Sequence, residues 1–159
     1  DRMEALKQIR HYLLTHEEDQ FTRNCPKCQG SGKPGMVKLG FDRATDEPEF
    51  VTCSACAGTG VMLTKTINKA GWVKRERQDD GDTAKMFHVF PEVFEKDIAR
   101  GHDTRTVLEL LKARKILQAD GKRGPFKTKA RPLHELGAPF ERPVDVYVIN
   151  LNAPGWESS

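Results

Sequence analysis

The chain contains four cysteines, and all of them belong to two copies of one short pattern. One copy spans residues 25–32, the other spans residues 53–60, and both read C-x-x-C-x-G-x-G. Two cysteines three positions apart on a tight turn can direct both sulfurs to one point, and two such turns complete a tetrahedron of thiolates. Glycines after each pair permit positive φ, so that backbone N–H groups can approach the sulfurs. The pattern therefore predicts a metal site made of Cys25, Cys28, Cys53 and Cys56.

Zn²⁺ is the expected ion, because tetrahedral thiolate sets of this spacing are typical of structural zinc sites. Disulfides and redox-active thiols are the alternatives. A secretion signal, which would favour disulfides, is not recognised in the sequence. A redox motif would have one pair beside a β-α-β pattern, which is also not recognised. Four cysteines leave no open position on the ion, so we expect one zinc with a structural role.

A β-hairpin is expected between the two cysteine pairs. Residues 36–41 and 49–52 are apolar or β-branched in part, and the segment 42–48 between them is rich in turn formers. Such a hairpin would bring the distant cysteine pairs together.

Outside the cysteine region, the sequence alternates between helical and extended patterns. Apolar residues at helical spacing predict a helix over residues 3–15. Pro91 suits the first turn of a second helix that Gly101 ends, and Asp103 caps a third helix that runs to Lys115. Extended segments are expected at residues 66–73, 86–90 and 144–149.

Positive charge is concentrated late in the chain. The formal net charge is only +3, but eight cations stand between Lys112 and Arg131 against a single acid, Asp120. A local excess of this kind indicates an anionic partner. The alternative is an ordinary solvated face.

The order helix, short turn with glycine, helix, basic loop and strand is the outline of a winged helix. The expected fold class is therefore α+β, a winged-helix-like domain with the zinc hairpin inserted. In this interpretation 103–115 is the recognition helix and 122–131 is the wing. The predicted DNA-binding residues are Arg105, Lys112, Arg114, Lys115, Lys122, Arg123, Lys127, Lys129 and Arg131. A small α+β domain whose helix pair only packs is the alternative.

The glycine pattern of residues 25–60 resembles the cysteine-rich region of DnaJ-type co-chaperones and the zinc module of lambdoid phage antitermination proteins. DnaJ-type proteins carry four copies of the repeat and a J domain with a His-Pro-Asp motif. This chain has two copies and no such motif. The resemblance therefore implies a local zinc fold rather than a co-chaperone activity.

A second resemblance covers most of the remaining chain. It rests on residues 5–13 with Phe21, on 67–72, and on Phe-Pro-Glu-Val-Phe at 90–94. Gly-His-Asp at 101–103, Val-Leu-Glu-Leu-Leu at 107–111 and Val-Tyr-Val-Ile at 146–149 complete it. These segments resemble the C-terminal region of helicase or primase-helicase-like proteins of phages, plasmids and integrative elements. The resemblance implies an accessory domain made of 1–21 and 65–159, with residues 22–64 as the inserted zinc module.

The ATPase motor of such helicases is not recognised here. Gly-Ser-Gly-Lys at 30–33 is a fragment of a P-loop, but Lys27 stands where the first glycine is required and Pro34 where Ser or Thr is required. The motor is expected upstream of Asp1 in a parent protein.

The leading functional hypothesis is a non-catalytic domain that binds DNA for a replication helicase. The alternative is a zinc-dependent module that docks a replication or transcription partner, as a phage antiterminator would. A catalytic role ranks last, because the five histidines are scattered and no carboxylate pair suggests catalysis. We expect a cytoplasmic protein with neither a membrane partner nor a small-molecule substrate. Trp72 is expected in the core, and Trp156 is expected to be exposed or bound to a partner.

Overall fold

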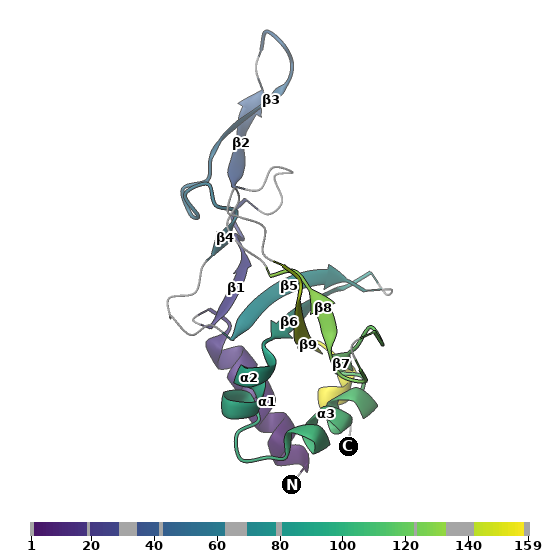
Figure 1. The fold of residues 1–159 in the computed structure, drawn as a ribbon. Helices are drawn as coiled ribbons and strands as arrows, with labels where there is room; N and C mark the ends of the chain where they lie inside the picture. Colours follow the sequence, from purple (N-terminus) through teal and green to yellow (C-terminus); the bar gives the residue numbers. More distant parts are fainter. Residues whose placement is uncertain are drawn as a thin grey trace.

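The computed structural model describes residues 2–18, 20–28, 35–41, 43–62, 70–78, 81–122, 124–132 and 142–157. It confirms the predicted α+β class. Helices lie against one side of a seven-stranded sheet, and a separate two-stranded hairpin extends away from the sheet (Figure 1). None of the described helices combines the length and apolar composition that a membrane-spanning helix requires.

The large sheet joins segments from both ends of the chain. Its order is β4 (Val61–Met62), β1 (Phe21–Asn24), β5 (Gly71–Arg77), β6 (Thr83–Val89), β9 (Val144–Asn150) and β7 (Leu117–Gln118). β8 (Thr128–Ala130) also pairs with β9. β1 runs parallel to β5, whereas β5, β6 and β9 are successively antiparallel. The strands predicted at 86–90 and 144–149 are confirmed, and β8 lies within a segment that we expected to be a loop.

Three helical segments pack on the sheet as the apolar spacing predicts. α1 (Arg2–His16) buries Ala5, Leu6, Ile9 and Leu13. α2 (Pro91–Val93) begins at the predicted proline and continues as the π-helical turn η1 (Phe94–Ile98). α3 (Thr104–Ala113) is capped by Asp103, whose side chain accepts a hydrogen bond from the Thr106 N–H. α3 ends two residues before Lys115, which has a left-handed φ of 58°.

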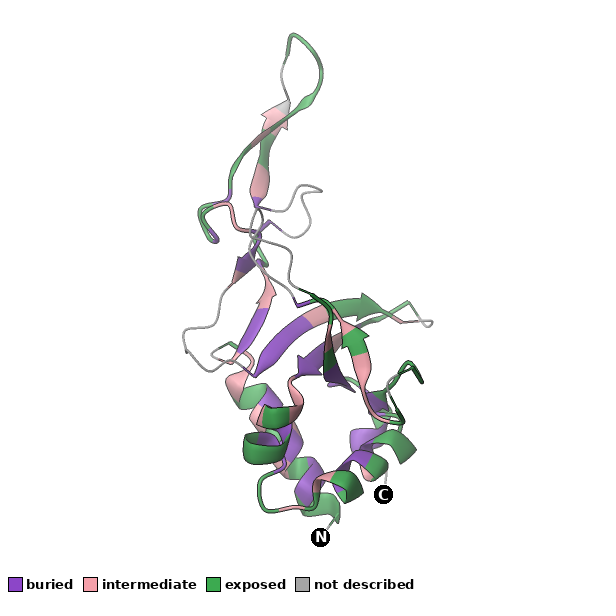
Figure 2. Ribbon diagram, in the orientation of Figure 1, coloured by how far each residue is buried: buried purple, intermediate pink, exposed green. Residues whose placement is uncertain are grey.

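The main core lies between the helices and one face of the sheet (Figure 2). Phe21 on β1 and Phe87 on β6 meet edge to face at 4.9 Å. The C-terminal turn η2 (Pro154–Trp156) belongs to this core. Trp156 is buried and its indole N–H donates to the carbonyl of Asn150 at 2.8 Å. The expectation that Trp156 is exposed is therefore wrong, because the tail folds back and supplies an acceptor for the indole.

A smaller cluster lies on the opposite face of the sheet. It contains Trp72, Ala84, Met86, Val146 and Val148, with Phe90 packed against them. Trp72 is only 1% exposed, as predicted for a core residue. Its ring stacks on the imidazole of His88 at 4.9 Å.

The predicted hairpin is confirmed as β2 (Met36–Phe41) and β3 (Pro48–Thr52), which pair antiparallel in a sheet of their own. β1 precedes this module and β4 follows it, and the two strands pair with each other at the edge of the large sheet. The module therefore projects from that edge (Figure 1). The winged-helix architecture and the domain boundaries at residues 21/22 and 64/65 stay predictions.

Candidate functional site

The four predicted ligands come together at the base of the hairpin. All four cysteines are buried, and their Sγ atoms lie within 4.8 Å of one another. The Sγ atoms of Cys25 and Cys53 are 3.8 Å apart, as are those of Cys28 and Cys56. A tetrahedral ion with metal–sulfur bonds of about 2.3 Å, the zinc value, would set its sulfurs about 3.8 Å apart. The cluster can therefore hold a metal ion, and its dimensions fit zinc.

The two halves of the cluster are joined by reciprocal backbone hydrogen bonds. The N–H of Cys25 donates to the carbonyl of Gly60 at 3.0 Å, and the N–H of Cys53 donates to the carbonyl of Gly35 at 2.8 Å. The same two glycines donate to the second cysteine of each pair. Gly35 N–H lies 3.3 Å from Cys28 Sγ, and Gly60 N–H lies 3.3 Å from Cys56 Sγ. Each half thus holds the first cysteine of the other half through its backbone, and polarises its own second sulfur through an amide donor.

Gly35 is the member of this arrangement that the repeat does not reveal. The repeat predicts this role for Gly60 in the second copy and for Gly30 or Gly32 in the first, but residues 29–34 lie outside the described part of the chain. Gly35 and Gly60 adopt φ values of 83° and 80°. Both glycines adopt this left-handed conformation directly before a strand, β2 or β4. This shared position identifies Gly35 as the partner of Gly60, whereas the spacing of the repeat does not.

The surroundings of Cys28 and Cys56 shift the pKa values of their thiols in opposite directions. Burial raises the pKa of the Cys28 thiol to about 11, although the Gly35 N–H partly offsets this effect. Burial also acts to raise the pKa of Cys56, but hydrogen bonds from the Gly60 and Gly58 amides outweigh it and lower the value to about 6. Backbone donors therefore favour a thiolate at Cys56, which is the form that a metal ion requires.

A second group of predicted site residues lies at the other end of the sheet. Lys112 on α3 and Lys115 after it line a hollow of about 520 Å³ together with residues 117–119, 121, 124 and 125. The described lining contains these two cations and no acid. The structure therefore brings the end of the predicted recognition helix and the predicted wing to one basic surface.

Two contacts organise the predicted wing. Phe126 packs against the main core, and the Lys112 ammonium lies 5.8 Å from the centre of its ring. The Asp120 carboxylate accepts hydrogen bonds from the backbone N–H groups of Lys122 at 2.9 Å and Lys129 at 3.4 Å. The lone acid of the segment thus shapes the turn through two backbone hydrogen bonds.

The remaining predicted DNA contacts are not equivalent. Arg105 is exposed but lies 3.3 Å from Glu109 in an ion pair along α3. Arg114 donates to the carbonyl of Gly155 at 2.9 Å, which commits one end of its guanidinium to the C-terminal turn. Lys129 and Arg131 are exposed, and Lys127 is half-buried. Arg123 lies outside the described residues.

His102, the histidine in the turn before α3, contacts α1. Its Nε2 lies 3.2 Å from Oε1 of Gln8, and Gln8 also donates to the carbonyls of Ile98 and Arg100. This network fixes the turn between η1 and α3. It gives His102 a structural role that its position in the sequence did not indicate.

Comparison with known proteins adds no identification. No protein-family model, curated protein or solved structure matches the chain.

Proposed function

We propose that this chain is a non-catalytic DNA-binding domain that carries one structural zinc ion and serves the replication helicase of a mobile genetic element. The observation that carries the proposal is the basic hollow between α3 and residues 117–125, with Lys112 and Lys115 on its wall and no acid in its described lining. Phosphate contacts by lysine side chains supply the sequence-independent part of DNA affinity.

In this proposal α3 is a recognition helix and the segment 122–131 is the wing of a winged-helix-like domain. The buried side of α3, formed by Val107, Leu108 and Leu111, holds the helix on the core. Its outer side carries Arg105 and Lys112, which are exposed. The described wing cations are Lys122, Lys127, Lys129 and Arg131, of which Lys122, Lys129 and Arg131 are exposed. The link to a helicase rests on the resemblance of 90–94, 101–103 and 107–111 to that family.

The zinc identity of the metal is part of the same proposal. Four buried cysteine sulfurs, two sulfur–sulfur separations of 3.8 Å and amide donors to Cys28 and Cys56 support it. A closed set of four sulfurs leaves no position for substrate, so the ion would stabilise the module rather than catalyse a reaction.

The test is a titration of the zinc-loaded protein against duplex, forked and single-stranded DNA at two salt concentrations. Changing Lys112 and Lys115 together to glutamine should weaken binding and lower the slope of log K against log salt by about two, because each lost phosphate contact contributes about 0.9 on duplex DNA. The matched control changes Lys7 and Lys96, which are exposed on α1 and η1. Equal affinity and slope in both variants would refute the proposal.

One observation favours a second candidate, a protein-docking module. Leu39 is 68% exposed and Val51 is 39% exposed, and both lie on the projecting hairpin. An exposed apolar pair on such a hairpin suits contact with a protein partner. This candidate replaces the first if serine at both positions abolishes binding of the parent helicase motor while the wild-type chain binds no DNA.

A further inference from the structure

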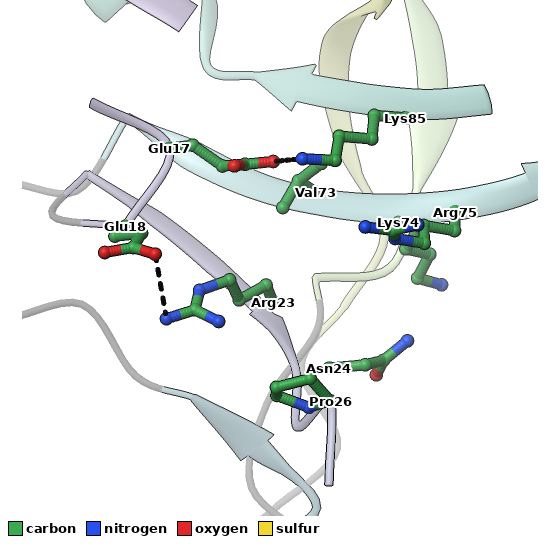
Figure 3. A pocket seen from close by; sticks show the side chains of 9 residues that line it. All are labelled: Glu17, Glu18, Arg23, Asn24, Pro26, Val73, Lys74, Arg75 and Lys85. Atoms are coloured by element: carbon green, nitrogen blue, oxygen red, sulfur yellow. Dashed lines mark ion pairs between the residues drawn. The ribbon is translucent and has the colours of Figure 1, made fainter. Parts of the chain in front are cut away.

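A second cationic site lies where the zinc module joins the sheet. It is a pocket of about 200 Å³ between the end of α1, β1, the first cysteine turn, β5 and β6 (Figure 3). Glu17 and Lys85 lie on one side of it, and Asn24 and Pro26 lie on the opposite side (Figure 3). We call it the Arg23 pocket; its lining includes Arg23, Lys74, Arg75, Lys85, Glu17 and Glu18. The four cations outnumber the two carboxylates, so the lining carries a net positive charge.

The register of the sheet concentrates these cations. Arg75 on β5 stands directly opposite Lys85 on β6, and Arg23 on β1 stands opposite Val73. Like charges in directly opposite positions repel each other. Glu17 offsets part of this repulsion, because its carboxylate lies 2.7 Å from the Lys85 ammonium. Arg75 has no ion pair within the described part of the chain.

Arg23 is the cation of the pocket with a buried donor that lacks a partner among the described residues. Its Nε is buried and has no hydrogen-bond partner among the described residues. Its Nη2 faces a single oxygen of Glu18 at 3.9 Å, which is an ion pair beyond hydrogen-bonding distance. A buried N–H without an acceptor is unfavourable. The Nε and Nη2 edge of a guanidinium suits two oxygens of one oxyanion.

Glu18 is the side chain that an incoming anion would displace. Its side chain is 79% exposed, and exposed ion pairs contribute little to stability. Displacement of Glu18 would free Nη2 at small cost. The pocket volume is several times the ~30 Å³ that one water occupies in the liquid, so it can admit an oxyanion with part of its hydration.

We infer that the Arg23 pocket binds a phosphate group, either free phosphate or the phosphate of a nucleic-acid strand. Arg23 holds two of its oxygens, while Arg75 and Lys85 balance its charge. This site is separate from the Lys112–Lys115 surface, which lies at the β7 end of the sheet, and it stands or falls independently of the proposed function.

The experiment follows the Arg23 Nε–H resonance of the zinc-loaded chain during titration with inorganic phosphate and, separately, with a short single-stranded oligonucleotide. Ionic strength is held constant with chloride. Phosphate should shift this resonance saturably, and Arg23→Gln should weaken binding at least tenfold as judged by the backbone amides of β1 and β5. Arg100→Gln is the matched control, because it removes an exposed arginine outside the pocket and should change nothing.

Glu18→Gln guards against a folding artefact at position 23. It leaves the Arg23 guanidinium intact and removes the carboxylate that competes with phosphate for it. Phosphate should therefore bind roughly two- to fivefold more tightly, in line with the small energy of an exposed ion pair.

An Arg23 resonance that responds to neither phosphate nor the oligonucleotide, or that responds equally to chloride, overturns the inference. A response to phosphate alone supports the pocket with free phosphate as its ligand. A response of the β1 and β5 amides to the oligonucleotide supports it with nucleic acid as the source, if Arg23→Gln abolishes this response and the Lys112 and Lys115 changes do not.

Discussion

The four-cysteine module and the seven-stranded sheet differ in the interactions that can stabilise them. The sheet packs Phe21, Phe87, Phe94 and their neighbours into a continuous apolar core against three helical segments. Among the described residues, the core of the module consists of four cysteines with Val37 and Met62 packed against them. Because this cluster buries little apolar surface, we propose that the fold of the module depends on metal–sulfur bonds.

The two regions nevertheless share a boundary. Cys25 follows β1 directly, and its N–H donates to Gly60 just before β4. β1 and β4 are also strands of the large sheet. Loss of the metal should therefore unfold the hairpin up to β1 and β4. Loss of the apolar core should destabilise both the sheet and the module that extends from it.

Loss of one zinc ligand should have the largest effect. Cys53→Ser removes a buried sulfur, and the module should lose most of the ~10–16 kcal/mol that binds a structural zinc. We expect no bound metal and a disordered hairpin, as measured by elemental analysis and amide exchange. Ser54→Ala, at the neighbouring exposed position, should bind metal normally. Retention of stoichiometric metal by Cys53→Ser would contradict the assigned ligand set.

Truncation in the apolar core is the complementary change. Phe87 is fully buried against Phe21, so Phe87→Ala should destabilise the sheet by about 3–5 kcal/mol. Thermal unfolding monitored by circular dichroism measures the effect. Leu39→Ala, at an exposed position of the hairpin, should change the stability of the sheet by less than ~0.5 kcal/mol. Similar losses for both would show that the regions are not stabilised separately.

Acid should weaken the sheet through His88. Burial, the largest effect, and the nearby Lys74 ammonium together lower the pKa of His88 from 6.5 to about 4, although the hydrogen bond with the Met86 carbonyl opposes both. The unfolded chain then binds more protons than the native chain between these values, so stability is complete above pH 6.5 and falls as pH approaches 4. The loss is about 3 kcal/mol at most.

His88→Phe provides the comparison for this pH dependence. It keeps a ring beside Trp72 but cannot titrate, so denaturant unfolding across pH 4–7 should show a flatter profile than that of the wild type. Metal release in acid affects both proteins alike. Parallel profiles would exclude His88 as the source of the acid sensitivity.

The smallest loss of stability is expected on changing the residue that caps the start of α3, Asp103. Asp103 accepts from the backbone N–H of Thr106 at 3.0 Å and from its hydroxyl at 2.6 Å, and these bonds lower the pKa of the carboxyl. Asp103→Ala should cost about 1 kcal/mol of stability. Asp103→Asn should recover most of this loss, because an amide oxygen can still cap the helix. An alanine variant as stable as the wild type would show that the cap is dispensable.

Sequence patterns predicted local structure well where one short segment determines the outcome. The cysteine spacing, the hairpin at 36–41 and 48–52, the proline start of α2 and the Asp103 cap all follow from neighbouring residues. Helical spacing also identified the buried side of α1. In each case the pattern and the physical cause lie within one turn or one strand.

Features that depend on distant contacts were missed. Nothing near Trp156 in the sequence reveals that the carbonyl of Asn150 accepts from its indole. Gly35 acquires its role from the Cys53 N–H, and Arg23 enters a cationic pocket only because β1 pairs with β5. The candidate metal ligands were therefore predictable, but the arrangement around them required the tertiary fold.

The most direct test of the contrast between the two regions is chelation of the purified chain, followed by native mass spectrometry and by amide NMR. We predict one zinc ion per chain before chelation. After its removal, the amides of 35–60 should move to random-coil positions, while those of β5, β6 and β9 remain dispersed. A reduced chain that binds no metal, or a sheet that unfolds together with the hairpin, would contradict the account.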